Sequence, residues 1–323
     1  MLNISLGLTT SIPIREGLKL AVLAEKIGFK RIFVGEDILS KDVFAYISVI
    51  ALETSRIELA TGITSPYLRH IVSLASNALA IQKISNGRFT LGLGPGGIPE
   101  LKRFLGKKPE KPVLVMRDAT LLIKKMFSGE RITYDGLLGK IEDFKLFSEN
   151  APIKIYFGVR GRKLLRLARE VADGVIFSGP KKYLEEVIKI VNEEDLEETE
   201  FNKIIWNCFL LIKNKKDLKL GKRVTATIIS SLSNEEIEKN YPELIDKSFR
   251  IKEAFIRGEY EKAEKLIDES IMKQLCFAGK LTEIEEDMAK LEKLGFKEFV
   301  VGPPFGKKPY ETILELKKLM NIA

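Results

Sequence analysis

Eight short apolar runs, each followed by a segment with helical periodicity, constrain the fold of this 323-residue chain more than any other feature. The runs do not alternate between apolar and polar residues, which is typical of parallel strands covered by helices. Eight strand–helix units predict a (β/α)8 TIM barrel, with residues 1–323 forming a single domain. A doubly wound sheet is the alternative, but the count of eight and the lack of an early GxGxxG motif disfavour it. The predicted strands are Ile4–Leu8, Arg31–Val34, Ile57–Gly62, Phe89–Leu93, Ile153–Gly158, Gly174–Phe177, Lys203–Ile212 and Glu298–Val301.

The segments between these runs carry apolar stripes with the 3.6-residue period of a helix that buries one face. Gly28 follows the first stripe in the position of a helix C-cap, and Asn86-Gly87 ends the second. The stripes consist of Leu20, Leu23, Ala24 and Ile27, then Ile71, Leu74, Ala75 and Ala78, then Val115, Ala119, Leu122, Ile123 and Met126.

Two insertions interrupt the repeat. Asp135-Gly136 lies between two strand-like runs just before the fifth strand, which predicts a β-hairpin there. The segment from about Lys213 to Lys273 is too long for one connection, so we expect additional helices between the seventh and eighth strands.

The composition argues against several classes of partner. No run of eighteen apolar residues predicts a membrane span, and 45% hydrophobic with 30% charged residues is typical of a globular protein. The net charge is +8, but basic and acidic residues are interleaved, so we expect an anionic small molecule rather than nucleic acid. The first residues lack the features of a signal peptide, which favours a cytoplasmic location. Abundant Lys, Glu, Ile and Leu with only two glutamines is the compositional bias of hyperthermophilic proteins.

The scarcity of histidine and cysteine argues against a metal centre. The chain contains one histidine, His70, and two cysteines, Cys208 and Cys276. A zinc site needs more ligands of these types, so we expect none. Both cysteines lie in apolar contexts and are predicted to be buried free thiols. His70 follows Arg69 at the start of a helix, which favours a structural or interfacial role over catalysis.

The carboxyl ends of the predicted strands carry the candidate binding residues, because the active site of such a barrel lies at that end. Three of these ends are rich in glycine, which lets the backbone approach a flat or phosphorylated ligand closely. Arg160, Arg162 and Lys163 begin the helix after the fifth strand, where positive side chains oppose the helix dipole. A bound anion such as a phosphate would resolve this conflict, and a solvated basic turn remains the alternative. The glycine-rich ends are Gly92–Gly97, Gly158–Lys163 and Gly302–Lys307.

Two adjacent acids, Glu36 and Asp37, follow the second strand at the mouth of the barrel. Neighbouring carboxylates repel each other, and a bound apolar ring would desolvate both. One of the two is therefore a candidate ligand contact, and Asp37 is a candidate general acid. The alternative is that Asp37 caps the following segment or pairs with Lys41.

Four long segments resemble a known family. They are LAEKIGFKRIFVGED, TGITSPYLRHIVSLASNALAIQKISNGRFTLGLGPG, PIKIYFGVRGRKLLRLAREVADGVIFSG and CFAGKLTEIEEDMAKLEKLGFKEFVVGPPFG, which together cover much of the chain. The sequence resembles the luciferase-like superfamily of flavin and deazaflavin enzymes, in its coenzyme F420-dependent branch, and within that branch the methylenetetrahydromethanopterin reductases. The resemblance implies a luciferase-like barrel that transfers a hydride between F420 and a C1-carrier pterin or another small organic substrate, as a homodimer or homotetramer.

The resemblance also implies roles for individual residues. The bond Gly62–Ile63 is expected to be a non-prolyl cis peptide in a bulge, with Ile63 behind the deazaflavin ring. The remaining contacts implied for the cofactor are Glu36 and Ser65 on the ring side, Pro95 and Gly96 along the ring or ribityl chain, and Arg160, Gly161, Lys163 and Leu164 at the phosphate.

The chain departs from the family pattern where a proton is handled. Gly7 and Gly97 stand where the methanopterin reductases carry acids, and Asp37 stands where relatives carry a histidine. Asp37 and Glu100 are therefore the candidate catalytic acids. An FMN-dependent monooxygenase of the same fold is one alternative function, and a cofactor-binding paralogue without this catalysis is another.

Overall fold

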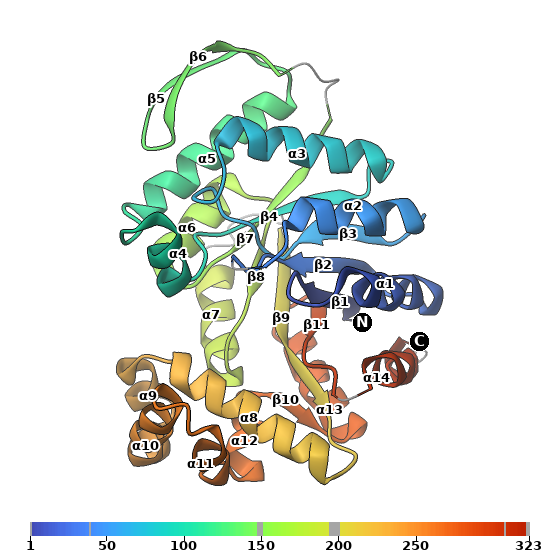
Figure 1. The fold of residues 1–323 in the computed structure, drawn as a ribbon, viewed down its shortest axis with the longest axis vertical. Helices are drawn as coiled ribbons and strands as arrows, with labels where there is room; N and C mark the ends of the chain where they lie inside the picture. The colour runs from blue at the N-terminus through green and yellow to red at the C-terminus, as the bar shows by residue number, and fades with distance from the viewer. Residues whose placement is uncertain (1, 39, 147–150, 194–200, 307, 321–323) are drawn as a thin grey trace.

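Eight parallel strands close into a barrel in the computed structural model, which describes residues 2–38, 40–146, 151–193, 201–306 and 308–320 (Figure 1). Each strand pairs with the next in parallel, and pairing of β8 with β9 closes the ring. The predicted (β/α)8 fold is therefore confirmed. The barrel strands are β1 (Asn3–Thr9), β2 (Arg31–Gly35), β3 (Glu58–Thr61), β4 (Phe89–Leu93), β7 (Lys154–Gly158), β8 (Gly174–Phe177), β9 (Asn202–Leu211) and β11 (Glu298–Gly302).

Helices cover the outside of the barrel with the predicted apolar stripes. In α1 (Ile14–Ile27), Leu20, Leu23 and Ala24 are buried, and Gly28 ends the helix in the left-handed conformation with φ 98°. The stripes of α3 (Ile71–Ile84) and α5 (Pro112–Phe127) are buried in the same way. The other helices of the ring are α2 (Val43–Glu53), α6 (Arg162–Val171), α7 (Lys181–Glu193), α13 (Leu281–Lys293) and α14 (Pro309–Glu315), with the short α15 (Lys317–Met320) behind them.

Both predicted insertions are present and lie at opposite ends of the molecule in Figure 1. The hairpin consists of β5 (Ile132–Gly136) and β6 (Gly139–Phe144), which pair in antiparallel fashion. The second insertion adds helices with a hydrophobic cluster of their own, and we propose that it belongs to the barrel domain because α12 packs against α7. Its elements are α8 (Lys215–Ser231), α9 (Asn234–Asn240), α10 (Ile245–Ile256), α11 (Tyr260–Lys265) and α12 (Glu269–Leu275).

One strand was not predicted. β10 (Phe277–Gly279) pairs in parallel with the end of β9, at Phe209 to Leu211, beyond the part of β9 that belongs to the barrel. Its three residues are too few for a periodicity to be recognised in the sequence.

A buried ion-pair network closes the amino end of the barrel. Arg31 donates to Glu298 at 3.1 Å and also binds Glu58, while Ser5 donates to Glu298 at 2.5 Å. Burial raises the pKa of Glu298 above its usual range, although the Arg31 guanidinium opposes that shift. Above this network six buried side chains fill the interior of the barrel. They are Phe33, Ala60, Tyr156, Ile176, Ile204 and Val300.

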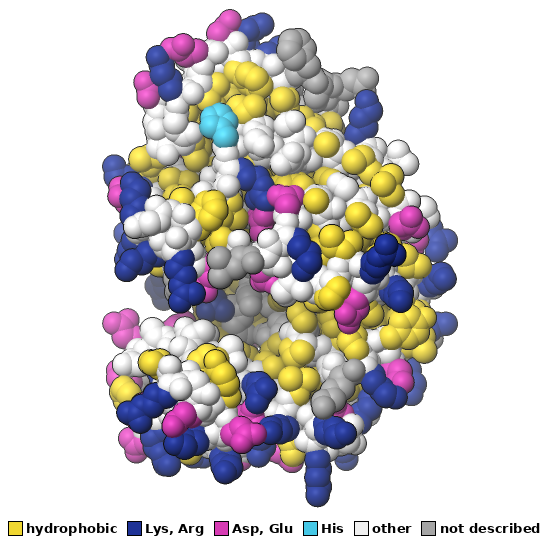
Figure 2. All heavy atoms as spheres, viewed as in Figure 1, with side chains coloured by type: hydrophobic (Ala, Val, Ile, Leu, Met, Phe, Trp, Pro, Cys, Tyr) yellow, Lys and Arg dark blue, Asp and Glu magenta, His cyan; other side chains and the backbone are white. Residues whose placement is uncertain are grey.

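Charged side chains of both signs are interleaved over the face seen in Figure 2, without a stripe of one sign. Among the described residues, no helix is long and apolar enough to cross a membrane.

Candidate active site

A cavity of about 1070 Å³ opens at the carboxyl end of the barrel. It is lined by residues from the ends of β1, β2, β3, β4, β7 and β8, by one residue of β9, and by the loop before α5. Nine of the twelve predicted site residues line it, which are Glu36, Asp37, Gly62, Ile63, Ser65, Pro95, Gly96, Arg160 and Leu164. Glu100, Gly161 and Lys163 are not among the residues that line the cavity.

The peptide bond Gly62–Ile63 is cis, as predicted. The backbone on both sides of it is hydrogen-bonded to neighbouring strands, because the Ile63 carbonyl accepts the Glu36 N–H at 3.1 Å and the Thr64 N–H donates to Gly92 O at 3.0 Å. The Ile63 side chain packs towards β4 and β7. A Cβ on Gly94 would lie 3.0 Å from Ile63 Cδ1, and one on Gly158 would overlap the Ile63 side chain. The bulge thus presents Ile63 on the β4–β7 side of the cavity floor.

The Glu36 carboxylate is held in a network beneath this bulge. It accepts from Thr64 Oγ1 at 2.6 Å and from Arg69 Nη1 at 2.8 Å, and Arg69 Nη2 binds its second oxygen. Arg69 also binds Asp42, which caps α2 by accepting the Ala45 N–H at 2.9 Å. Burial lowers the pKa of Arg69, but its bonds to Glu36 and Asp42 outweigh burial and raise it. Arg69 therefore links Glu36 to Thr64 of the bulge and to Asp42 at the start of α2, which is a framework role.

Asp37 lies exposed at the edge of the cavity. Its carboxylate accepts the Ser11 N–H at 3.2 Å, and its own N–H donates to Thr10 Oγ1 at 2.9 Å. The alternative partner, Lys41, donates instead to the carbonyl oxygens of Thr10 and Ser11. The suggested Asp37–Lys41 ion pair is therefore wrong, and the Asp37 carboxylate faces the cavity with a single backbone donor.

The predicted phosphate region lies at the start of α6. Gly161 precedes the helix with φ 84°, and no side chain caps the first N–H groups. The Arg160 Nε donates to Ser178 O at 2.9 Å, and the guanidinium lies 6.0 Å from the centre of the Tyr183 ring. Arg160 is thus positioned at the cavity, whereas Lys163 is exposed on the first turn of α6.

The loop after β4, the strand next to β7, also lines the cavity. Ser65 Oγ donates to Pro95 O at 3.0 Å, and Gly96 has φ 83°, a conformation that favours glycine. Glu100 lies in the first turn of α4 (Ile98–Leu105), with its carboxylate turned back over Gly97 rather than into the cavity. Two basic residues that were not predicted, Lys108 and Lys111, line the rim on this side.

Trp206 is the main residue of the cavity that sequence reasoning missed. It lies in the middle of β9, is half-buried, and lines the floor. A Cβ on Gly7 would lie 2.8 Å from its Cζ2 atom, and one on Gly302 would lie 2.8 Å from its Nε1 atom. Its inward position in an apolar strand, together with its status as the only tryptophan, was the available signal.

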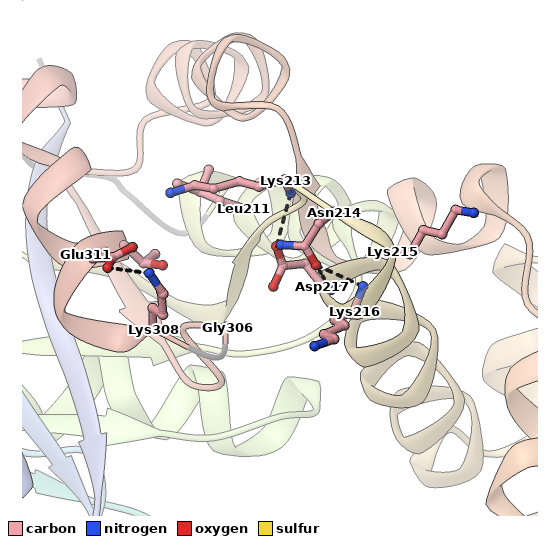
Figure 3. Close-up of a pocket in the computed structure, with 10 residues that line it drawn as sticks. Leu211, Lys213, Asn214, Lys215, Lys216, Asp217, Gly306, Lys308 and Glu311 are labelled. Atoms are coloured by element: carbon pink, nitrogen blue, oxygen red, sulfur yellow. Dashed lines mark hydrogen bonds and ion pairs between the residues drawn. The ribbon is translucent and has the colours of Figure 1, made fainter.

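A second cavity, of about 670 Å³, lies beside the start of α8 and between the loops that follow β9 and β11 (Figure 3). Lys213 and Lys308 line it, and each is ion-paired to a glutamate at 2.6 Å. Asn214 caps α8, and Asp217 accepts the Lys213 N–H at 3.2 Å. Because these groups already have partners within the protein, we assign no ligand to this cavity.

The two cysteines are free thiols, as predicted. Cys276 is buried, whereas Cys208 is partly exposed, which corrects the expectation that both are buried. The neighbouring Cys276 thiol and burial raise the pKa of Cys208 above its usual range. Among the described residues, no group of three or more His, Cys, Asp or Glu is arranged to hold a metal ion.

The sequence from residue 3 to residue 298 matches the family described as luciferase-like monooxygenase, and the chain belongs to this family. It is 27% identical over 311 residues to the 5,10-methylenetetrahydromethanopterin reductase of Methanolobus tindarius, with 93% of this chain and 94% of that enzyme covered. It is 29% identical over 179 residues to the F420-dependent glucose-6-phosphate dehydrogenase of Beutenbergia cavernae, with 52% and 53% covered.

A solved structure shows the same fold. The coenzyme F420-dependent tetrahydromethanopterin reductase from Methanopyrus kandleri superposes with a TM-score of 0.88 at 23% sequence identity. The superposition covers 98% of this chain and 97% of that chain, so the barrel and its insertions have counterparts in that enzyme.

Proposed function

We propose that this protein is a coenzyme F420-dependent oxidoreductase that transfers a hydride between F420 and a pterin-type C1 carrier. The observation that carries the proposal is the cavity at the carboxyl end of the barrel, with Ile63 of the cis bulge on its floor and Arg160 at its edge. Relatives that align with nearly the whole chain are named as methylenetetrahydromethanopterin reductases, which supports this substrate class.

The residues present fit such a cofactor. A planar ring needs an apolar support, and the side chains of Ile63, Val159 and Leu164 line one side of the cavity. A phosphate needs donors, and the uncapped N–H groups of α6 together with Arg160 supply them. When bound, F420 supplies the hydride chemistry at C5 of its ring.

The chain's own residues would bind and orient the cofactor ring and hold the proton that is transferred. The Glu36–Arg69 network fixes the bulge, so that Ile63 supports the ring from below. Asp37 is the carboxyl group at the cavity whose oxygen atoms are not held by a cation, and we assign it the role of holding the transferred proton. Proton transfer by a positioned carboxyl group contributes about 10²–10⁴-fold to a rate.

An absorbance titration with F420 and, separately, with FMN tests the cofactor. We expect saturable binding of F420 and at least about tenfold weaker binding of FMN. Tight binding of FMN with oxygen-consuming turnover would favour a monooxygenase instead. Tight binding of F420 without turnover on methylenetetrahydromethanopterin or glucose 6-phosphate would favour a binding protein without this catalysis.

A further inference from the structure

Glycines on β1, after β3 and on β11 leave room for the Trp206 indole in the barrel mouth. The positions that a Cβ would take on Gly7, Gly62 and Gly302 all lie closer than 3.0 Å to its indole ring. Side-chain carbons do not approach aromatic atoms so closely without displacing them, so these strand ends must be glycine for the indole to lie where it does. Phe33 packs edge-on against the ring, with 6.0 Å between the ring centres. The indole therefore lies between these glycines and Phe33, with part of its surface exposed to the cavity.

The polar atom of this ring is available to a ligand. Among the described residues, no acceptor binds the Trp206 indole N–H, and this nitrogen is not among the fully buried atoms without a partner. Because Trp206 lines the cavity, its accessible N–H is open to a molecule bound there. Indole N–H groups usually find a hydrogen-bond partner when they lose contact with water.

Trp206 and Ile63 divide the floor between them. Ile63 packs towards Gly94 and Gly158 at the ends of β4 and β7, in the cavity that Arg160 and Leu164 also line and where the cofactor is proposed to bind. Trp206 packs against Gly62 of the bulge as well as towards Gly7 of β1 and Gly302 of β11, on the side that carries Thr9 and Asp37. The indole thus lies on the side left for the substrate.

We propose that Trp206 determines substrate specificity by offering its indole as a platform for a planar unsaturated ring, with the indole N–H donating to an acceptor atom of that ring. The pyrimidinone ring of a pterin has this chemistry, with carbonyl and ring-nitrogen acceptors in a flat π system. This assignment rests on the proposed function, and it names the side chain that recognises the substrate class. It also means that position 7 of β1 offers no side chain to the substrate, because the indole occupies that space.

The intrinsic fluorescence of the protein tests the platform without turnover, since Trp206 is the only tryptophan in the chain. In the cofactor-free protein, methylenetetrahydromethanopterin should quench this fluorescence saturably, and glucose 6-phosphate, which has no π system, should not. Absent quenching by the pterin, or equal quenching by both compounds, would overturn the proposal.

Two substitutions separate the stacking from the hydrogen bond. Trp206→Leu removes the platform and should weaken pterin binding, measured by calorimetry, by about tenfold or more. Trp206→Phe keeps a flat ring but removes the N–H, and should weaken pterin binding by about fivefold. F420 binding, read from its visible absorbance, should change by less than about twofold in both variants. Thermal unfolding shows whether both variants fold. If Trp206→Leu does not fold, the pterin affinity of Trp206→Phe alone tests the proposal.

The outcomes distinguish the platform from the proposed function. If the wild-type protein does not bind F420, the proposed function fails, and the pterin quenching still decides for or against the platform. The platform is overturned while the function stands if F420 binds but Trp206→Leu leaves the affinity for the pterin unchanged. The same conclusion follows if Trp206→Leu lowers the affinity for F420 as much as the affinity for the pterin.

Discussion

The two halves of the cavity are built by different means. On the β3–β4–β7 side, the shape comes from the backbone, through the bulge at Gly62–Ile63, the turn at Gly96 and the uncapped start of α6. On the β1–β2–β9 side it comes from side chains, with Trp206 as the floor and Asp37 as the exposed carboxylate. The shape of the proposed cofactor half therefore depends on local chain geometry. The shape of the substrate half depends instead on the side chains that the barrel brings together from distant strands.

Asp37→Asn should have the largest effect and should act on the substrate half alone. We expect F420 binding to be kept and turnover to fall by about 10²–10⁴-fold, because the amide cannot exchange the proton. Stopped-flow reduction of F420 measures the turnover, and an absorbance titration measures the binding of F420. Full activity of Asp37→Asn would exclude it as the proton donor. Glu100→Gln is then the next variant, since a loss there would place the donor at the start of α4.

Arg69→Met should damage the cofactor half through the framework beneath it. The substitution leaves the Glu36 side chain, only 6% exposed, without its cationic partner. Breaking a buried pair from one side costs about 3–5 kcal/mol, and we expect a loss of this size in the free energy of unfolding, with weakened F420 binding.

The matched control is Arg257→Met, which breaks an exposed pair with Glu253 and should cost less than about 1 kcal/mol in denaturant titrations. The double variant Glu36→Gln with Arg69→Met should recover part of the stability. Equal losses in the free energy of unfolding for Arg69→Met and Arg257→Met would contradict the framework role of Arg69.

Arg160→Ala should weaken F420 binding by tenfold or more, because a charge-assisted bond to a phosphate contributes about 1.5–3 kcal/mol. Lys163→Ala should have a smaller effect, since Lys163 does not line the cavity whereas Arg160 does. Absorbance titrations at low and high salt measure both, and high salt should reduce the difference. An unchanged dissociation constant in both variants would remove the phosphate site from this end of α6.

The barrel was predictable because its information is local. Each strand is a continuous apolar run and each helix a stripe, so eight units could be counted and placed in order. The glycine-rich strand ends also carry local information, which located Pro95, Gly96 and Arg160 at the cavity mouth. The cis bond at Gly62–Ile63 was predicted from the family resemblance and is present.

The substrate half was less predictable because it depends on contacts between distant strands. Nothing near Trp206 in the sequence reveals that Gly7 and Gly302 leave room for its ring, since these residues are on three strands. In the same way, the sequence placed Glu36 and Asp37 side by side, with Glu36 as a cofactor contact implied by the family resemblance and Asp37 as the candidate acid. Only the fold shows that Arg69 holds one of them and leaves the other exposed.

Paired glycine substitutions test the division into halves most directly. Gly7→Ala places a Cβ 2.8 Å from Trp206 Cζ2 and should displace the indole at a cost of about 1–3 kcal/mol in unfolding free energy. Gly158→Ala has the matching effect on Ile63, since its Cβ would overlap that side chain. We expect Gly7→Ala to shift the Trp206 emission and to leave F420 affinity within about twofold. Gly158→Ala should weaken F420 binding and leave the emission unchanged.

A double-mutant cycle shows whether the cost of Gly7→Ala comes from the indole. In a Trp206→Leu background the smaller, flexible side chain can yield to the new Cβ, so most of the penalty should disappear, which gives a coupling energy of about 0.5–3 kcal/mol. Urea unfolding of the four proteins measures it. Additive costs would mean that the indole does not fill the space beside Gly7. If Gly158→Ala shifted the Trp206 emission as strongly as Gly7→Ala, the floor would respond as one unit, and the division between a cofactor half and a substrate half would fail.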